Sequence, residues 1–202
     1  MGLYDRYLAA RVRRRADALP RQVAVVLTER DLLEQGAYRT LEAFFSWAFE
    51  FGAERVLVYV SVLDPAAVPT IRRVIERCEA PRALAVRGPE DQERADTPIQ
   101  VSVGLGGKHE FATAVRGLAG DVAADELDPE AIDAAAVEER LVFPTQPDLV
   151  IKTGGERLSD FMIWQSVYSE LHFTDVNWRD FRRREYLRAL RDYANRKRRY
   201  GR

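Results

Sequence analysis

Short apolar runs rich in β-branched residues alternate along this chain with segments of helical periodicity. The runs are Val23–Leu27, Arg55–Ser61, Ala83–Val86, Ile99–Val103 and Leu149–Ile151. Strands that are buried on both faces have this near-continuous apolar character, and parallel strands need helical crossovers between them. The alternation therefore predicts an α/β fold: one domain over residues 1–202, with a mostly parallel central sheet of about five or six strands and helices on both faces.

The helical pattern is clearest in Ala37–Phe51, where apolar residues share one side and Gly52 follows as a C′ residue. The other predicted helices are Pro69–Glu79, His109–Leu118, Pro129–Glu139, Asp160–Leu171 and Arg182–Lys197. We also expect a basic helix within residues 1–19 and a C-terminal tail over residues 190–202.

Four residues follow the ends of predicted strands: Thr28, Ser61, Gly104 and Lys152. In open parallel sheets, ligands bind beyond the carboxyl ends of the strands. We therefore expect the functional site at this edge of the sheet.

The last predicted strand runs into a glycine-rich turn that is bracketed by cations. Alone, Gly154 and Gly155 describe only a tight turn. Exposed backbone N–H groups at a strand-to-helix turn suit a phosphate, and arginine adds a bidentate fork while lysine adds a point charge. The sequence therefore predicts a diphosphate-binding segment, whose residues are Lys152, Thr153, Gly154, Gly155, Glu156, Arg157 and Ser159.

The stretch from Pro147 to Asp175 resembles the signature of the cis-prenyltransferases, which make undecaprenyl and dehydrodolichyl diphosphate. That signature is Arg-Thr-Gly-Gly-Glu, a short basic segment, Ser-Asn-Phe, then Trp-Gln and Tyr-Ser-Glu-Leu-x-Phe. The matching residues here are Lys152 to Glu156, Arg157, Ser159, Asp160, Phe161, Trp164, Gln165 and Tyr168 to Phe173. The resemblance implies condensation of isopentenyl diphosphate onto an allylic diphosphate, with Mg²⁺ as the cofactor and a dimer as the assembly.

The front of the chain departs from the family at the position of its catalytic aspartate. Family members follow the first strand with Asp-Gly-Asn-x-Arg-Trp, in which the Asp holds the magnesium ion. Here Thr28 stands at the Asp, and Glu29 and Arg30 replace the Gly and Asn. A neutral hydroxyl does not supply the negative charge that a hard Mg²⁺ ion prefers. The sequence therefore assigns no catalytic residue, and Glu29 and Asp31 are the nearby carboxylates left to replace the aspartate.

Glu170 corresponds to the family glutamate that completes the magnesium site. With Thr28 in place of the aspartate, its partner is missing, and a structural hydrogen-bond acceptor is the alternative role. We therefore expect the isolated chain to bind Mg²⁺ poorly.

Two further signatures are eroded in the middle of the chain. The family's Phe-Ser-x-Glu-Asn-Trp is replaced by Val60–Pro65, and its Asn-Tyr-Gly-Gly-Arg by Gly104–Lys108, which keeps two glycines and the cation. The segment between Asp64 and Val101 is also shorter than in the family, whose helices there line a hydrophobic tunnel. The resemblance therefore implies that the tunnel of this chain has less room for a growing prenyl chain.

The residues Arg199-Tyr200-Gly201 resemble the family's C-terminal Arg-x-Gly tail. In dimeric members this tail reaches the partner's site, so Arg199 and Gly201 are assigned there. Heteromeric members include subunits that lack the catalytic Asp and keep the tail. Three functions stay open: a non-catalytic or weakly catalytic subunit paired with a complete cis-prenyltransferase, an active homodimeric short-chain enzyme, and a diphosphate- or lipid-carrier-binding protein without catalysis.

The formal net charge of −1 argues against a nucleic-acid partner. Cys78 is the one cysteine, so no internal disulfide is possible, which is consistent with a cytoplasmic protein. No run approaches the roughly 20 apolar residues of a membrane span. The basic runs Arg11–Arg15 and Arg196–Arg199 are explained most simply as solvated surface, with peripheral membrane contact as the alternative.

Overall fold

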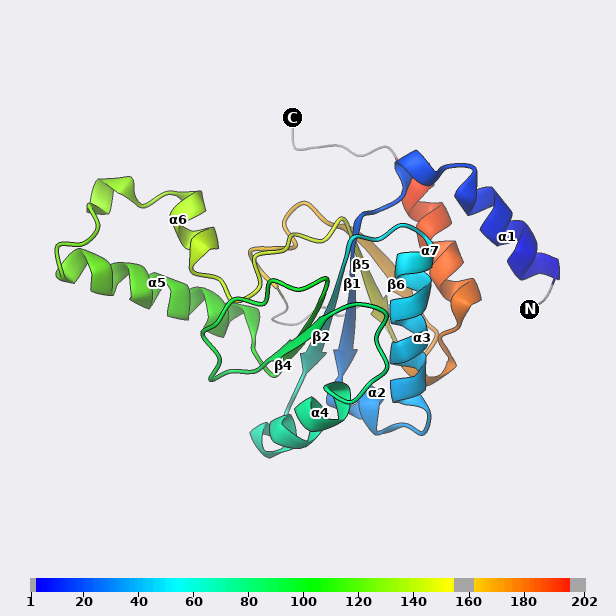
Figure 1. Ribbon diagram of the computed structural model, residues 1–202, viewed down its shortest axis with the longest axis horizontal. Coiled ribbons are helices and arrows are strands. Elements are labelled where there is room, and N and C mark those ends of the chain that lie inside the picture. The colour runs from blue at the N-terminus through cyan, green and yellow to red at the C-terminus, as the bar shows by residue number, and fades with distance from the viewer. Residues whose placement is uncertain (1–2, 155–161, 197–202) are drawn as a thin grey trace.

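The computed structural model describes residues 3–154 and 162–196. Within them, six strands form one parallel sheet in the order β3-β4-β2-β1-β5-β6 (Figure 1). The strands are β1 (Gln22–Thr28), β2 (Arg55–Ser61), β3 (Leu84–Arg87), β4 (Ile99–Val103), β5 (Leu149–Thr153) and β6 (Glu170–Thr174). The predicted α/β class with a parallel sheet is confirmed.

Seven α-helices connect and flank the described strands. They are α1 (Leu3–Arg13), α2 (Glu29–Leu33), α3 (Ala37–Glu50), α4 (Val68–Ile75), α5 (Gly107–Ala123), α6 (Ala134–Glu139) and α7 (Arg183–Asn195). Short 3₁₀ turns lie at Ala16–Ala18, Pro65–Ala67, Pro129–Ala131 and Trp178–Asp180.

The central strand β1 is buried on both faces, as its apolar run predicted. Val23, Val25 and Leu27 point into one core, whereas Ala24 and Val26 point into the other. Successive strand residues alternate between the two faces of a sheet, so a strand with a core on each side needs apolar residues throughout.

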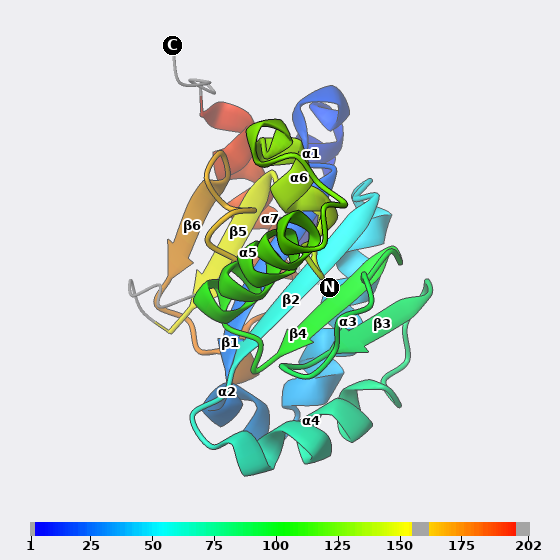
Figure 2. The same ribbon diagram turned by 90° about the vertical axis from the view of Figure 1, so that its left-hand side faces the viewer.

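The larger core lies under α1, α3 and α7, which cover one face of the sheet, and α4 adds apolar residues to it (Figure 2). Aromatic rings fix α3 against the C-terminal part of the chain. The Phe44 ring meets Trp178 edge-on at 5.9 Å between centroids, and Tyr186 at 5.5 Å. The indole nitrogen of Trp178 donates to the carbonyl oxygen of Ala37 at 3.0 Å, so this buried polar atom is satisfied.

The smaller core lies on the opposite face, under the first half of α5. It contains Leu105, Val142, Phe143 and Met162 against β1, β2 and β5. The second half of α5 extends away from the sheet together with α6 (Figure 1). Helices therefore occupy both faces, as predicted.

Two helix predictions are wrong in the described residues. The segment predicted as a helix over Asp160–Leu171 contains only turns from residue 163 to 168 and then enters β6, whose first residue Glu170 pairs with Leu149. The predicted helix Pro129–Glu139 is a 3₁₀ turn followed by α6, because the Asp133 carboxylate accepts from the Ala136 N–H and starts a new helix there.

The boundary of the predicted C-terminal tail also shifts. Helix α7 continues to Asn195, so residues 190–195 of the expected tail are helical. The tail residues Arg199 and Gly201 lie outside the described residues.

Candidate functional site

The structure brings the strand-end residues together at one edge of the sheet. Thr28 pairs with Ser61, and Lys152 pairs with Val26, two residues before Thr28. The Gly104 N–H donates to the carbonyl oxygen of Val60 at 2.9 Å, just before Ser61. The sequence prediction of a shared carboxyl edge is therefore met by the described residues.

Thr28 caps the short helix that follows β1. Its hydroxyl accepts from the Asp31 N–H at 3.3 Å, and the Asp31 carboxylate accepts from the Thr28 N–H and hydroxyl, each at 2.8 Å. These reciprocal bonds form a capping box. The Thr28 hydroxyl thus bonds to its own helix α2.

The neighbouring carboxylate of Glu29 is also engaged by the backbone. It accepts from the N–H groups of Leu63 at 3.0 Å and Asp64 at 3.3 Å. Glu29 therefore ties α2 to the loop after β2. The carboxylates of Glu29 and Asp31, which the sequence offered as replacements for the aspartate, both accept backbone N–H groups.

Glu170 lies at the other end of the sheet from Thr28. It opens β6 and pairs with the first residue of β5, whereas Thr28 closes β1. The strand register separates the two by five residue steps, roughly 16 Å along the strand direction. The Glu170 carboxylate accepts instead from Arg196 at 3.0 Å.

These placements bear on the Mg²⁺ ion that the family implies. Within residues 3–154 and 162–196, no group of three or more His, Cys, Asp or Glu side chains could hold a metal ion. Mg²⁺ prefers carboxylate oxygens, and those at Asp31 and Glu29 accept backbone N–H groups while Glu170 is on the opposite edge. The described donors of a single chain therefore do not fit a magnesium site.

The beginning of the predicted diphosphate segment is well defined. The Lys152 ammonium donates to the carbonyl oxygen of Thr153 at 2.5 Å. Thr153 is fully buried, and its hydroxyl has no hydrogen-bond partner within the described structure. Gly154 has φ +68°, which favours glycine, and its N–H donates to the carbonyl oxygens of Thr174 and Val176. Gly155, Glu156, Arg157 and Ser159 lie outside the described residues.

The chain that follows this segment returns directly onto the start of α5. A Cβ added to Gly107 would lie 2.9 Å from the Ile163 nitrogen and 3.0 Å from the Met162 nitrogen, so this approach requires glycine. The Phe111 ring stacks on Trp164 at 5.7 Å between centroids. The second glycine-rich turn, Gly104–Lys108, thus packs against Met162 and Ile163, which follow the diphosphate segment.

Glu110 is a buried residue of this junction that the sequence did not reveal. The residue is 5% exposed, and its carboxylate accepts from the Phe143 N–H at 2.8 Å and from the Gln165 amide at 3.0 Å. The same Gln165 amide donates to the carbonyl oxygen of Phe143 at 2.8 Å. Burial raises the pKa of the Glu110 carboxyl, and its hydrogen bonds oppose part of that rise.

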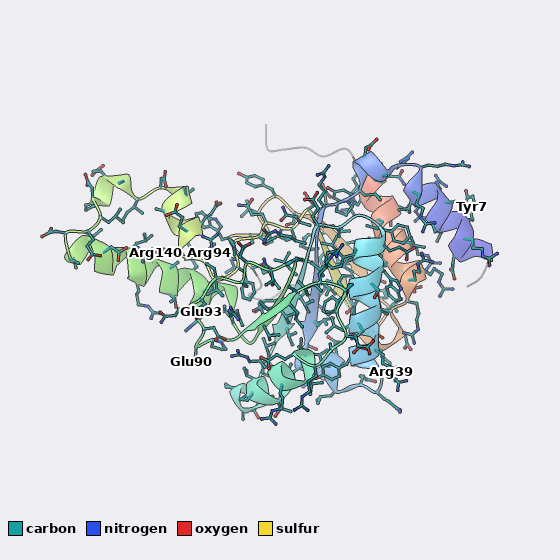
Figure 3. The ribbon with its side chains drawn as sticks, viewed as in Figure 1. Tyr7, Arg39, Glu90, Glu93, Arg94 and Arg140 are labelled. Carbon is teal, nitrogen blue, oxygen red and sulfur yellow. The ribbon has the colours of Figure 1, made fainter. Side chains whose placement is uncertain are left out.

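A groove of about 610 Å³ lies beside α5. Arg94 and Arg140 line it, and Figure 3 shows both near the junction of α5 and α6. Glu139 also lines it, and Arg140 pairs with Asp121. Lys152, Thr153 and Gly154, the predicted diphosphate-binding residues that the structure describes, do not line this groove, and its mixed charge assigns no ligand.

No helix among the described residues has the length and apolar character needed to cross a membrane.

Comparison with solved structures supports the fold. The crystal structure of lavandulyl diphosphate synthase from Lavandula x intermedia superposes with a TM-score of 0.75 at 23% identity, covering 92% of this chain and 100% of that one. A probable undecaprenyl diphosphate synthase from Campylobacter jejuni gives 0.67 at 17% identity, covering 91% and 99%.

Sequence comparison identifies closer relatives. The short-chain Z-isoprenyl diphosphate synthase of Mycobacterium bovis is 38% identical in an alignment of 193 residues that covers 77% of this chain and 73% of that protein. A tritrans,polycis-undecaprenyl-diphosphate synthase of Methanopyrus kandleri is 42% identical in an alignment of 139 residues that covers 67% of this chain. That match spans about half, 48%, of the archaeal protein. The prenyltransferase family model for undecaprenyl diphosphate synthase matches residues 78–201. The chain therefore belongs to the cis-prenyltransferase family.

Proposed function

We propose that this chain is the non-catalytic or weakly catalytic subunit of a heteromeric cis-prenyltransferase that condenses isopentenyl diphosphate onto an allylic diphosphate. The observation that carries the proposal is the Thr28–Asp31 capping box. The resemblance noted from the sequence assigns the position of Thr28 to the metal-binding aspartate. A hydroxyl committed to a helix cap cannot act as an anionic metal ligand.

In this role the chain contributes two things to the complex. The segment from Lys152 to Ser159 binds a diphosphate, and Arg199 and Gly201 reach the partner's isopentenyl diphosphate. The partner supplies the aspartate, the Mg²⁺ ion and the chemistry. The buried Thr153 hydroxyl, which has no partner within the described structure, is consistent with a donor kept at the start of this segment.

The surface after the diphosphate segment suits subunit contact. Four apolar side chains there are exposed in the single chain: Ile163, Val167, Tyr168 and Phe173, at 43%, 66%, 70% and 37%. Phe111 on α5 is 37% exposed and stacks on Trp164 beside them. Large exposed apolar side chains close together in the sequence are typical of an interface. We propose that this surface, residues 163–173, forms the dimer contact.

An active homodimeric short-chain enzyme is the second candidate. It is favoured by the identity of 37–38% to relatives named (2Z,6E)-farnesyl diphosphate synthase and short-chain Z-isoprenyl diphosphate synthase. Under this alternative, a carboxylate outside the described residues or from the second subunit holds the Mg²⁺ ion.

Incorporation of radiolabelled isopentenyl diphosphate separates the two candidates. The chain is assayed alone and co-expressed with a complete cis-prenyltransferase from the same source. The proposal expects no turnover alone and a stimulated rate for the pair. Substantial turnover by the chain alone, abolished by Arg157→Ala, would establish the homodimeric enzyme instead.

A further inference from the structure

The first basic run of the sequence, Arg11–Arg15, lies against the C-terminal end of α7. Arg15, at the end of the first run, hydrogen-bonds the side chain of Asn195 and, at 3.4 Å, the carbonyl oxygen of Ala194. Asn195 is the last residue of α7, and Arg196 opens the second run. Residues 180 positions apart in the sequence thus bring α1 and the end of α7 together into one basic end of the described structure.

Helix α1 carries most of this basic end. Its buried side chains, Leu8, Ala9 and Val12, lie on one side of the helix and belong to the larger core. Its other side exposes Arg6, Tyr7, Arg11 and Arg13 to solvent, and Arg14, in the turn that follows the helix, is exposed as well. A spacing of about 100° per residue places the four helical residues on one continuous half of the helix.

The arginines of this face are poorly neutralised. Arg13 pairs with Glu50, whereas Arg6, Arg11 and Arg14 have no ion pair within the described structure. Asp5 is the acidic residue of α1, and Asp17 follows in the 3₁₀ turn Ala16–Ala18. The surplus of positive charge contrasts with the overall net charge of −1, so the charge of this chain is strongly localised.

Tyr7 lies on the outer side of α1 (Figure 3), where it is 58% exposed and its hydroxyl accepts from Arg11 at 3.4 Å. A tyrosine among arginines is suited to a membrane surface, because its ring lies at the headgroup level while cations meet anionic lipids.

We infer that this basic end, formed by α1 and the end of α7, is a docking surface for an anionic lipid bilayer. Charge complementarity argues for this occupant. The apolar side of α1 is already covered by the core, so the helix cannot insert, and binding is electrostatic and sensitive to salt.

The placement leaves the candidate site free. In Figure 1 the C-terminal ends of α1 and α7 lie at the edge where β1 begins, opposite the strand ends that carry Thr28 and Lys152. Adsorption through the basic end therefore keeps the carboxyl edge open to soluble diphosphates. The inference does not depend on whether this chain is catalytic.

Vesicle sedimentation tests the inference on the full chain. We expect binding to phosphatidylcholine vesicles that contain phosphatidylglycerol, little binding to phosphatidylcholine alone, and release at high salt. The triple variant Arg6→Glu, Arg11→Glu, Arg14→Glu is expected to bind the anionic vesicles more than about tenfold more weakly. The conservative variant with Lys at the same three positions is expected to retain binding.

The control reverses three exposed arginines elsewhere: Arg39, Arg73 and Arg77. It has the same net charge as the α1 variant and is expected to bind like the wild type. Equal loss in both variants would overturn the inference, because net charge alone would then explain adsorption. Loss of binding in the Lys variant, binding of neutral vesicles, or binding of duplex DNA in preference to anionic vesicles would overturn it as well.

Discussion

The amide of Gln165 donates to the carboxylate of Glu110 across 55 positions of sequence. Because Gln165 also donates to the carbonyl oxygen of Phe143, and Phe143 donates its N–H to Glu110, three separate segments close one hydrogen-bonded ring. This ring fixes the chain shortly after the diphosphate segment onto α5. Removing one member of such a buried network destabilises the fold, because the remaining polar groups are left buried without a hydrogen-bond partner.

Removing the Glu110 side chain is therefore expected to destabilise the protein. Glu110→Ala leaves the Phe143 N–H and the Gln165 amide without their acceptor and should lower the free energy of unfolding by about 2–4 kcal/mol. Glu110→Gln keeps the volume and one acceptor oxygen and should cost less. Urea unfolding at fixed pH measures both, and equal losses in the two variants would contradict this account.

The ionisation of Glu110 also predicts a pH dependence. Its pKa in the folded state is raised above the unfolded value of about 4.3, so the folded state holds the proton more tightly. Stability is then highest below that unfolded value and falls as pH rises through the folded pKa. Glu110→Gln should remove this component, so its stability relative to the wild type should improve from acidic to neutral pH. Parallel pH profiles of the two proteins would refute the assignment.

Restoring the family aspartate tests the capping box. In Thr28→Asp the new carboxylate can still cap α2, but it faces Asp31 and creates a pair of like charges. We expect Mg²⁺ to bind to this variant and to relieve the repulsion, which calorimetric titration detects against the wild type. In the heteromeric complex the same change should leave turnover nearly unaltered, and a large gain would favour the homodimeric enzyme.

Arg157→Ala tests the diphosphate segment. The variant should weaken binding of isopentenyl diphosphate by about 1.5–3 kcal/mol, the scale of a hydrogen bond to a charged group. Arg73→Ala, at an exposed residue of α4, is the matched control. Unchanged affinity in the Arg157 variant, measured by calorimetry, would reject the segment as a binding site.

Deleting Arg199–Arg202 tests the proposed role of the tail. The complex should remain assembled while its turnover falls, because an arginine fork on a diphosphate often stabilises the transition state by about 3 kcal/mol or more. Steady-state kinetics of co-expressed pairs report the loss, and size-exclusion chromatography checks assembly. Full activity after the deletion would defeat the accessory-subunit proposal.

The proposed dimer surface predicts that a charge placed on it weakens subunit association, whereas a charge on another exposed apolar residue does not. Tyr168→Asp should weaken subunit association by about 2 kcal/mol, the scale of an interface hot spot. Leu63→Asp is the control, since Leu63 is 73% exposed but lies in the loop after β2. Sedimentation velocity measures both, and the idea fails if the two variants associate equally well.

The sequence alone determined the parallel sheet, its two-sided burial and its carboxyl edge. Continuous apolar runs such as Arg55–Ser61 and Ile99–Val103 matched their strands at both ends. That success has a local cause, because the pattern of a strand buried on both faces records burial within the strand itself. The family signature from Lys152 onward is likewise local and was readable without any tertiary contact.

The tertiary structure decided what depends on distant partners. A helix was predicted over Asp160–Leu171, after the glycine-rich turn. Instead, Gln165 donates to Glu110, and β6 forms just after Tyr168 because Glu170 pairs with β5. The placement of Glu170 opposite Thr28 and the contact of Arg15 with the end of α7 also follow from pairing between remote segments. The local sequence pattern predicts whether a residue is buried. The hydrogen-bond partner of a buried polar residue comes from a distant segment, and only the tertiary structure identifies it.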